Sequence, residues 1–282
     1  MEKPSTQTYE DLKEIAYTLR VECVRMIHHA KSGHVGGSLG LADVFAALFF
    51  KILRHDPSNP TWEERDRFIL SNGHVAPLLY ASMAYSGYFP VDELMTLRQL
   101  ESRLQGHPSR KNLPGIEIST GSLGQGLGVA VGMALAIRQK KQYHRIYCSI
   151  GDGESQEGSI WEAALSAGFH QLDNLTVFMD RNFIQIDGNT EEIVALEPLV
   201  EKWEAFRWHV IEANGHNFES IMNAFEAAQT FKGKPSIILF KTKLGYPVSF
   251  MEGNAKWHGT PPNDEEAQKA LEEIEHTYRE GR

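Results

Sequence analysis

Five short runs rich in β-branched and aromatic residues constrain the fold of this chain more than any other feature of its sequence. The runs are RFILS at 67–71, HRIYCSI at 144–150, LTVFMD at 175–180, WHVIEAN at 208–214 and SIILFKT at 236–242. Segments of helical periodicity alternate with them, at 76–87, 159–170 and 218–231. Because this alternation is typical of parallel sheets, we predict an α/β fold in three layers, a parallel sheet with helices on both faces.

Further helices are predicted at both ends of the chain. Apolar residues recur at helical spacing over 12–27, and this helix should end before the Gly-rich stretch SGHVGGSLG at 32–40. A second helix is predicted over 41–53. The tail 263–282 carries four apolar residues on one helical face, which could pack on this chain or on another: Ala267, Ala270, Leu271 and Ile274. Since no linker or repeat divides the sequence, we predict that residues 1–282 form a single domain.

Charge and cysteine content exclude several classes of function. The formal net charge of −9 leaves no general basic surface, so nucleic acid and anionic membranes are not expected partners and any phosphate binding must be local. Cys23 and Cys148 are far apart and form no CxxC pair, which favours a reduced compartment. Residues 1–16 lack a basic stretch followed by an apolar core, and no later run could span a bilayer. We therefore predict a cytoplasmic protein.

Polar residues follow two consecutive predicted strands. Asp152 stands between two glycines directly after the run 144–150, and Asn182 follows the run 175–180. Their spacing of thirty positions (182 − 152) is about what two strands and one helix require. Because the carboxyl ends of parallel strands meet at one edge of a sheet, Asp152 and Asn182 should lie close together.

A charged and a neutral oxygen ligand suit a hard cation. Mg²⁺ or Ca²⁺ would be completed by water and by the phosphates of a diphosphate ligand, and the glycines beside Asp152 let the backbone approach that ligand closely. An isolated GDG would instead indicate a turn, and Asn182 a helix cap. The paired placement after two strands favours the cation site.

Five of the twelve histidines stand in short glycine-containing motifs: His34, His74, His107, His216 and His258. No pair has the HExxH or Cys/His spacing of a zinc site. The other seven are interpreted as surface or capping imidazoles: His28, His29, His55, His144, His170, His209 and His276.

A second glycine-rich stretch, STGSLGQGLGVAVGMALAIRQ at 119–139, opens a predicted helix. It is neither a GxGxxG after a strand nor a GxxxxGK[ST], so a Rossmann or P-loop interpretation is weak. Gly128 and Gly132, further along the helix, are interpreted as positions of close packing.

Together these motifs resemble a known family. A GDG followed about thirty residues later by Asn resembles the thiamine-diphosphate motif, and residues from about 10 to about 262 resemble the amino-terminal, diphosphate-binding half of transketolase. The resemblance implies a thiamine-diphosphate-binding fold, with thiamine diphosphate and Mg²⁺ (or Ca²⁺) as cofactors. It implies that Asp152, Asn182 and the main-chain carbonyl of Ile184 ligate the metal. It also implies a set of cofactor contacts: His74, Gly121, Ser122, Leu123, Gly153, Glu157, Asn182, Ile186 and His258.

The same resemblance implies catalytic roles for His34, His107 and His258, around the carbonyl and hydroxyls of the donor sugar. Imidazole suits ketose cleavage because its pKa lies near neutrality and it can both donate and accept a proton. Glu157 and Glu162 would lie near a dimer interface, with Glu162 in a proton network across it, although such acids by default form a solvated face. His216 resembles a structural loop of the family and is left out of the site.

A whole transketolase is more than twice as long as this chain. The resemblance therefore implies a split enzyme, in which a separate pyrimidine-domain subunit completes the site and two copies of each chain form a heterotetramer. The implied reaction moves a two-carbon ketol unit from a ketose phosphate to an aldose. Leu244 and Pro247 depart from a basic or glycine-rich KGxG, which puts in question a cationic contact to the cofactor from this loop.

Two other functions are compatible with the GDG and Asn motif. One is the α-subunit of another thiamine-diphosphate enzyme, such as a 2-oxoacid dehydrogenase. The other is a non-catalytic interaction module that keeps the fold and binds the cofactor. The glycine-histidine motifs together with KWHG at 256–259 favour ketol transfer over both.

Overall fold

The fold is built on a five-stranded sheet, in a computed structural model that describes residues 7–280. The strand order is β1-β2-β3-β7-β6, and every neighbouring pair is parallel. The strands are β1 Arg67–Leu70, β2 Ile146–Gly151, β3 Leu175–Arg181, β6 His209–Asn214 and β7 Ser236–Lys241. A short antiparallel hairpin, β4 Ile184–Gln185 with β5 Gly188–Asn189, follows β3. All five predicted strand runs are confirmed, and their carboxyl ends share one edge.

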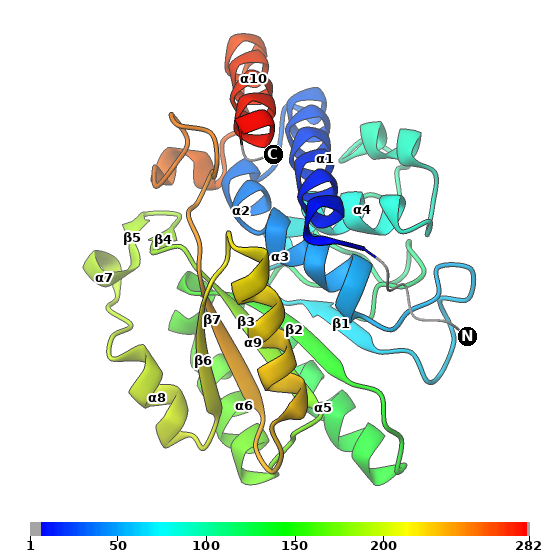
Figure 1. Ribbon diagram of the computed structural model, residues 1–282, viewed down its shortest axis with the longest axis vertical. Helices are drawn as coiled ribbons and strands as arrows, with labels where there is room; N and C mark the ends of the chain where they lie inside the picture. Colours follow the sequence, from blue (N-terminus) through cyan, green and yellow to red (C-terminus); the bar gives the residue numbers. More distant parts are fainter. Residues whose placement is uncertain (1–6, 281–282) are drawn as a thin grey trace.

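Helices cover both faces of this sheet, with α9 in front of it and α5 and α6 behind it in Figure 1. The first face carries α1 Tyr9–Ala30, α3 Ala42–Ala47, α4 Ala76–Tyr85 and α9 Phe218–Thr230. The second face carries α5 Gln125–Gln139, α6 Gly158–Phe169 and α8 Leu199–Ala205. The remaining α-helices are α2 Val35–Gly40, α7 Thr190–Ile193 and α10 Asp264–Glu280. The predicted three-layer parallel architecture is therefore confirmed.

Alternate residues of each central strand enter different cores. In β3, Phe178 packs among the helices of the first face, whereas Val177 and Met179 pack among those of the second. Every residue of β3 is buried. A sheet covered on both faces needs apolar side chains at successive positions, which explains why the strand runs are continuously apolar rather than alternating.

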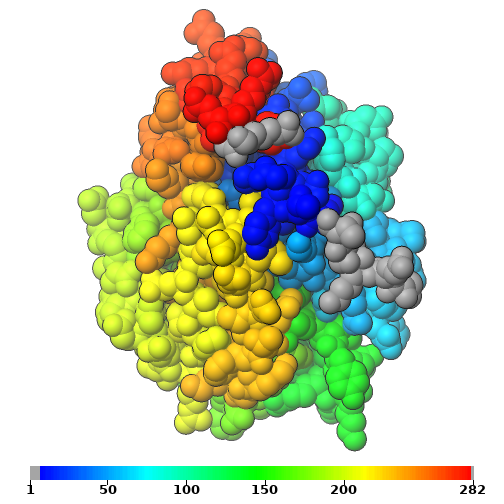
Figure 2. Space-filling model, viewed as in Figure 1, coloured from blue at the N-terminus to red at the C-terminus, as the bar shows by residue number. Residues whose placement is uncertain are grey.

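The tail helix α10 packs on α1. The rings of Tyr17 and Tyr278 stack with centroids 4.4 Å apart, and the surfaces of the two helices meet at the top of the molecule (Figure 2). Ala267, Ala270 and Ile274 are buried in the first core. The apolar face of the tail therefore packs on this chain, which settles the alternative that the sequence left open.

The glycine-rich stretch after α1 contains a helix that its composition does not predict. Within it, α2 packs so tightly that a Cβ on Gly36 would lie 2.7 Å from the Leu244 side chain, and one on Gly40 would lie 2.7 Å from the Lys243 carbonyl oxygen. Glycine is a poor helix former, so local propensity argues against this helix. Its packing against the segment after β7 outweighs that propensity.

Three sequence expectations can be compared directly with the fold. In the range 7–280, no helix combines the length and the apolar character needed to cross a bilayer. Cys23 and Cys148 are both buried and free. The close-packing interpretation of Gly128 and Gly132 is wrong for this chain, because nothing lies within 4 Å of a Cβ built at either position.

Gly168 is a helical glycine that packing does require. A Cβ at this position of α6 would lie 1.9 Å from the main-chain oxygen of Phe206. We expect Gly168→Ala to lower the free energy of unfolding by about 3 kcal/mol, because a backbone segment must move. Gly132→Ala in α5, where space is open, should raise it by about 0.5–1 kcal/mol. Urea titrations followed by circular dichroism measure both, and equal effects of the two substitutions would contradict the packing argument.

Candidate active site

Asp152 joins the loops that follow β2 and β3. Gly151 lies opposite Asp180 in the parallel register, and the Asp152 main-chain N–H donates to the Asp180 carbonyl oxygen at 3.2 Å. The Asp152 carboxylate accepts from the main-chain N–H groups of Gly153 and Phe183, each at 2.7 Å. The expectation that the two loops lie side by side is thus confirmed, whereas metal ligation remains a prediction.

Asn182 is oriented by its own loop and by a neighbouring acid. Its Oδ1 accepts from the Ile184 N–H at 2.8 Å, and its Nδ2 donates to Asp180 Oδ2 at 2.8 Å. Asp180 also accepts a hydrogen bond from Thr242 at the end of β7. The amide oxygen keeps a second lone pair, so this arrangement leaves Asn182 able to bind a cation.

Two buried carboxyl groups meet at this point. Burial raises the pKa of Asp152 to about 6, with Arg181 opposing the shift. Burial, together with the Asp152 charge, raises the pKa of Asp180 to about 7. In the described part of the chain, no group of three or more His, Cys, Asp or Glu side chains is arranged to hold a metal. The predicted donor set is of another kind, a carboxylate, an amide and a main-chain carbonyl, and oxygen donors of this sort fit Mg²⁺ or Ca²⁺.

Four of the motif histidines come together in one cluster, which we call the histidine cluster: His34, His74, His107 and His258. The ring of His34 lies 5.3 Å from that of His74, 6.2 Å from that of His107 and 5.7 Å from that of His258. His74 and His258 are 5.0 Å apart. The four residues come from the N-cap of α2, from two short 3₁₀ helices and from the loop before α5. Only the tertiary fold brings these segments together.

The histidine cluster and the strand-end acids form one site. A Cβ on Gly37 in α2 would lie 3.9 Å from His74 Nε2 and 4.0 Å from Asp180 Oδ2. Gly121 has a φ of +147°, and a Cβ there would lie 3.2 Å from the His107 ring. The glycine loop before α5 therefore lies directly against the cluster, as its assignment to cofactor binding requires.

Burial keeps the clustered imidazoles neutral. It lowers the pKa of His34 to about 4, with His258 and Arg98 adding to the shift. It lowers the pKa of His74 well below its usual value, and it lowers those of His107 and His258. A neutral imidazole has one donor and one acceptor nitrogen, which suits binding and proton exchange with hydroxyl groups.

Several buried polar atoms of these loops have no hydrogen-bond partner within the described chain: Asn72 Oδ1, Thr120 Oγ1, His34 Nδ1 and His258 Nδ1. Buried polar atoms in folded proteins are normally paired. The unpaired atoms here belong to the histidine cluster and to loops beside it. Their hydrogen-bonding capacity fits a polar ligand such as a diphosphate.

The remaining predicted residues lie around this site or on the surface. Glu157 is the N-cap residue of α6, and it and Glu162 are both exposed. Ile186, in the turn of the β4 and β5 hairpin, is 66% exposed. Ser122 is exposed and Leu123 half-buried. In this chain these side chains are available for contacts with a ligand or another polypeptide, and their assigned roles remain predictions.

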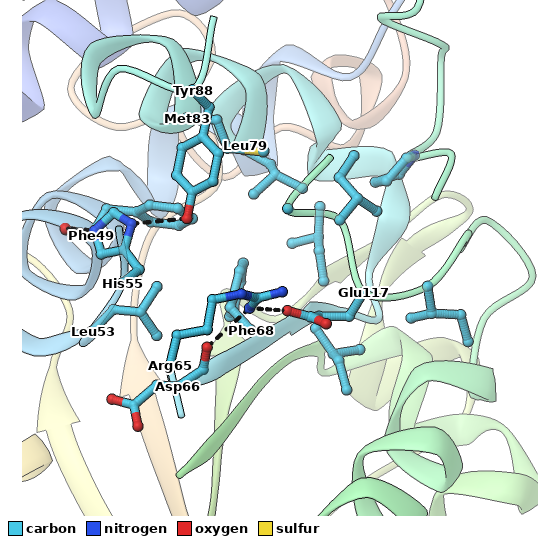
Figure 3. Close-up of a pocket in the computed structure, with 16 residues that line it drawn as sticks. Phe49, Leu53, His55, Arg65, Asp66, Phe68, Leu79, Met83, Tyr88 and Glu117 are labelled. Atoms are coloured by element: carbon cyan, nitrogen blue, oxygen red, sulfur yellow. Dashed lines mark hydrogen bonds and ion pairs between the residues drawn. The ribbon is translucent and has the colours of Figure 1, made fainter. Parts of the chain in front are cut away.

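The interpretation of His144 as a surface or capping imidazole is wrong, because this residue is only 4% exposed. His55 is half-buried, and its ring contacts the Tyr88 hydroxyl at 3.0 Å and the Phe49 carbonyl oxygen at 2.9 Å. His55 lines an internal pocket of about 20 Å³ (Figure 3). That volume holds roughly one water molecule, so the pocket is too small for a cofactor.

His216 has the structural role that the sequence predicts. Its Nδ1 contacts Asp43 at 3.0 Å, and its Nε2 accepts from the Lys243 N–H at 3.0 Å. The nearby Leu244 is fully buried against α2. At this departure from the family pattern an apolar side chain therefore supports the helix that begins after His34.

Sequence reasoning missed Arg181 and Glu154. Arg181 donates to Asp152 at 3.2 Å and to Glu191 and Glu197 at 2.8 Å each, so it links the predicted metal ligand to the segment after the hairpin. Glu154 is buried among the loops of the site. Both residues lie within three positions of motif residues, but their partners are distant in sequence, and no local pattern indicates them.

Acids, an amide and neutral imidazoles at the carboxyl edge of a parallel sheet are typical of an α/β domain that binds a phosphorylated cofactor. The chain matches the family described as "Transketolase, thiamine diphosphate binding domain" over residues 12–278, and it belongs to the transketolase family. The predicted family and thiamine-diphosphate-binding fold are therefore confirmed.

Relatives of two lengths support this assignment. The chain is 47% identical to the 6-deoxy-6-sulfo-D-fructose transketolase subunit of Clostridium sp. (strain MSTE9), over 94% of this chain and 96% of that protein. It is 42% identical to an apulose-4-phosphate transketolase subunit of Phocaeicola vulgatus, over 90% of each chain. The crystal structure of Campylobacter jejuni transketolase superposes with a TM-score of 0.91 at 40% identity, covering 96% of this chain but 43% of that one. The chain thus spans less than half of the full-length transketolases that it matches.

The low pKa of His34 predicts a specific pH dependence of stability. Between about pH 6.5 and pH 4 the unfolded chain binds a proton at His34 that the folded chain does not, so stability falls as the pH is lowered. We expect a slope below about 1.4 kcal/mol per pH unit, since the ring is partly exposed and screened. His34→Gln should flatten this acid limb, whereas His276→Gln on exposed α10 should leave it unchanged. Urea unfolding from pH 4 to 7 measures the slopes, and an unchanged slope in His34→Gln would refute the assignment.

Proposed function

We propose that this chain is the diphosphate-binding, amino-terminal subunit of a transketolase, and that it transfers a two-carbon ketol unit from a ketose phosphate or related sugar to an aldose. The observation that carries this proposal is its similarity, along nearly its whole length, to two proteins named as transketolase subunits. A separate pyrimidine-domain subunit would complete the site, in a heterotetramer with two copies of each chain. The cytoplasmic location and the single domain over residues 1–282 belong to the same proposal.

The cofactor-binding part of the proposal uses the loops described above. Asp152, Asn182 and the Ile184 carbonyl would hold Mg²⁺, or Ca²⁺ in its place. The diphosphate of thiamine diphosphate would lie among Gly153, His74 and His258, beside the glycine loop at 121–123. When bound, thiamine diphosphate supplies a nucleophilic carbon and an electron sink for cleaving a carbon–carbon bond.

The histidine cluster would bind the sugar and move its protons. Neutral His34 and His107 can donate to a carbonyl oxygen and accept from a hydroxyl, since burial lowers the pKa of each ring. His258 lies 5.7 Å from His34, ring to ring, and 5.0 Å from His74. It would therefore serve both the sugar and the diphosphate.

The names of two relatives bear on the substrate class. One acts on 6-deoxy-6-sulfo-D-fructose and the other on apulose 4-phosphate. Both are sugars that carry an anionic group. We propose an anionic ketose as donor for this chain as well, with the anion bound mainly by the partner subunit.

Cofactor binding is testable without catalysis. Thiamine diphosphate with Mg²⁺ should raise the melting temperature of the wild-type chain, because a ligand that binds only the folded state stabilises it. Asp152→Asn removes the charged metal ligand, and we expect it to lose most of that shift, because losing a direct ligand costs more metal affinity than the roughly 10–100-fold typical of an outer-shell partner. Asp92→Asn, an exposed site in the 3₁₀ helix Val91–Thr96, is the control. A wild-type shift that Asp152→Asn retains in full would contradict the metal assignment.

Reconstitution tests the split site. The purified chain with thiamine diphosphate, Mg²⁺ and sugars should show no ketol transfer, because the pyrimidine-binding half is supplied by another polypeptide. Co-expression with a pyrimidine-domain subunit should restore transfer, measured as loss of donor ketose and gain of the product aldose. Turnover by the chain alone would refute the split site. Oxidative decarboxylation of a 2-oxoacid by the complex would favour the other enzyme class.

A further inference from the structure

Glu154 is a buried acid at the centre of the cofactor loops. It follows Asp152 and Gly153 in a 3₁₀ turn, and it is 2% exposed. The ion pairs among residues 7–280 do not include it. Its carboxylate is therefore held by hydrogen-bond donors rather than by a cation, and a buried carboxylate without such partners would be strongly destabilising.

Three donors from three loops converge on this carboxylate. The Ser71 hydroxyl and the Gly124 N–H donate to Oε1, the latter at 2.8 Å. The Gly151 N–H donates to Oε2 at 3.1 Å. Ser71 Oγ in turn accepts from the Gly126 N–H at 3.0 Å. One side chain thus connects the end of β1, the end of β2 and the start of α5.

Each connected loop carries a different part of the proposed cofactor site. Ser71 precedes Asn72 and His74, Gly151 directly precedes Asp152, and Gly124 directly follows the loop at 121–123. The relative position of the three parts therefore depends on Glu154.

The start of α5 packs so closely against Ser71 that no side chain fits between them. A Cβ on Gly126 would lie 2.5 Å from Ser71 Oγ, and Gly124 has a φ of +82°, which few residues other than glycine adopt. The backbone of α5 can thus reach the Ser71 and Glu154 side chains only because these two positions are glycine. The close contact between α5 and the Ser71 and Glu154 side chains therefore depends on glycine at both positions.

We propose that Glu154 is a positioning residue, which holds three loops in the arrangement that binds the cofactor and so sets the affinity for thiamine diphosphate. A preorganised site binds more tightly because ordering the loops costs nothing further on binding. The ligand named here rests on the proposed function. The prearrangement of the loops does not, and it is tested separately.

Glu154→Gln is the sharpest substitution. Glutamine keeps the size of the side chain but has one acceptor oxygen and a donor NH₂, so it cannot satisfy donors on both carboxylate oxygens. We expect the variant to fold and to bind thiamine diphosphate, in saturating Mg²⁺, with a Kd about 10–100-fold higher than that of wild type. Isothermal titration calorimetry measures the Kd. Glu219→Gln, on the exposed start of α9, is the matched control and should bind as wild type does.

Hydrogen exchange tests the positioning without any ligand. The amides of Gly124 and Gly151 donate to Glu154, and the Gly126 amide donates to Ser71, so all three should exchange about 10-fold faster or more in Glu154→Gln, while core amides of β3 stay unchanged. Ser71→Ala is a milder change that removes the acceptor of the Gly126 amide and one donor to Glu154. We expect faster exchange at Gly126 and a smaller rise at Gly124 and Gly151, which keeps the test decisive if Glu154→Gln folds poorly.

The outcomes separate the two proposals. If the wild-type chain does not bind thiamine diphosphate but exchange rises at those amides, the positioning is supported and the named ligand is not. If exchange is unchanged, or if Glu154→Gln binds with the wild-type Kd, the positioning role is overturned. Uniformly faster exchange across both cores in Glu154→Gln would show that Glu154 merely stabilises the whole fold. That result would also overturn the positioning role.

Discussion

Parallel pairing of the strands is the constraint on which the site depends. Because β1, β2, β3 and β7 all point the same way, their carboxyl ends deliver four loops to one edge of the sheet. The main-chain N–H and C=O groups of those loops lie beyond the hydrogen bonds of the sheet and need other hydrogen-bond partners. Buried side chains supply them, with Asp152 accepting from Phe183 and Glu154 accepting from Gly151 and Gly124. The same acids that satisfy the backbone thus bring negative charge and fixed geometry to the place where a cation and a diphosphate would bind.

Such a site is stabilised less by its own contacts than an ordinary core is. Asp180 and Asp152 lie close together with their pKa values raised, and several polar atoms around the histidines have no partner within the described chain. These features lower the stability of the protein alone. They also increase the binding free energy that a ligand can obtain by pairing with these groups. The two hydrophobic cores, one on each face of the sheet, offset this loss of stability at the edge of the sheet.

The sequence predicts the scaffold well because its signals are local. Continuous apolar runs such as 175–180 mark strands buried on both faces, and the spacing of Asp152 and Asn182 follows from one crossover. The convergence of His34, His74, His107 and His258 is different, because it depends on contacts between segments far apart, and only the family resemblance indicates it. No local pattern indicates Glu154, whose partner Ser71 is 83 positions away. The helix α2 is also missed, since propensity opposes it and packing alone decides it.

The surface of the chain indicates how the site would be completed. At the edge of the sheet where the proposed diphosphate site lies, Asp152 is buried, and Asn182 and the rings of the histidine cluster are partly buried. Glu157 and Glu162, at and after the start of α6, instead face solvent, and Ile186 is two-thirds exposed. An apolar side chain at the rim of a polar site gains stability only when another surface covers it. If the reactive end of the cofactor lies against Ile186, then that end is the part this chain leaves uncovered. A second polypeptide at this rim would bury the isoleucine, exclude water from the reacting atoms and bring the groups that this chain lacks, so one contact would account for both the exposed rim and the incomplete chemistry.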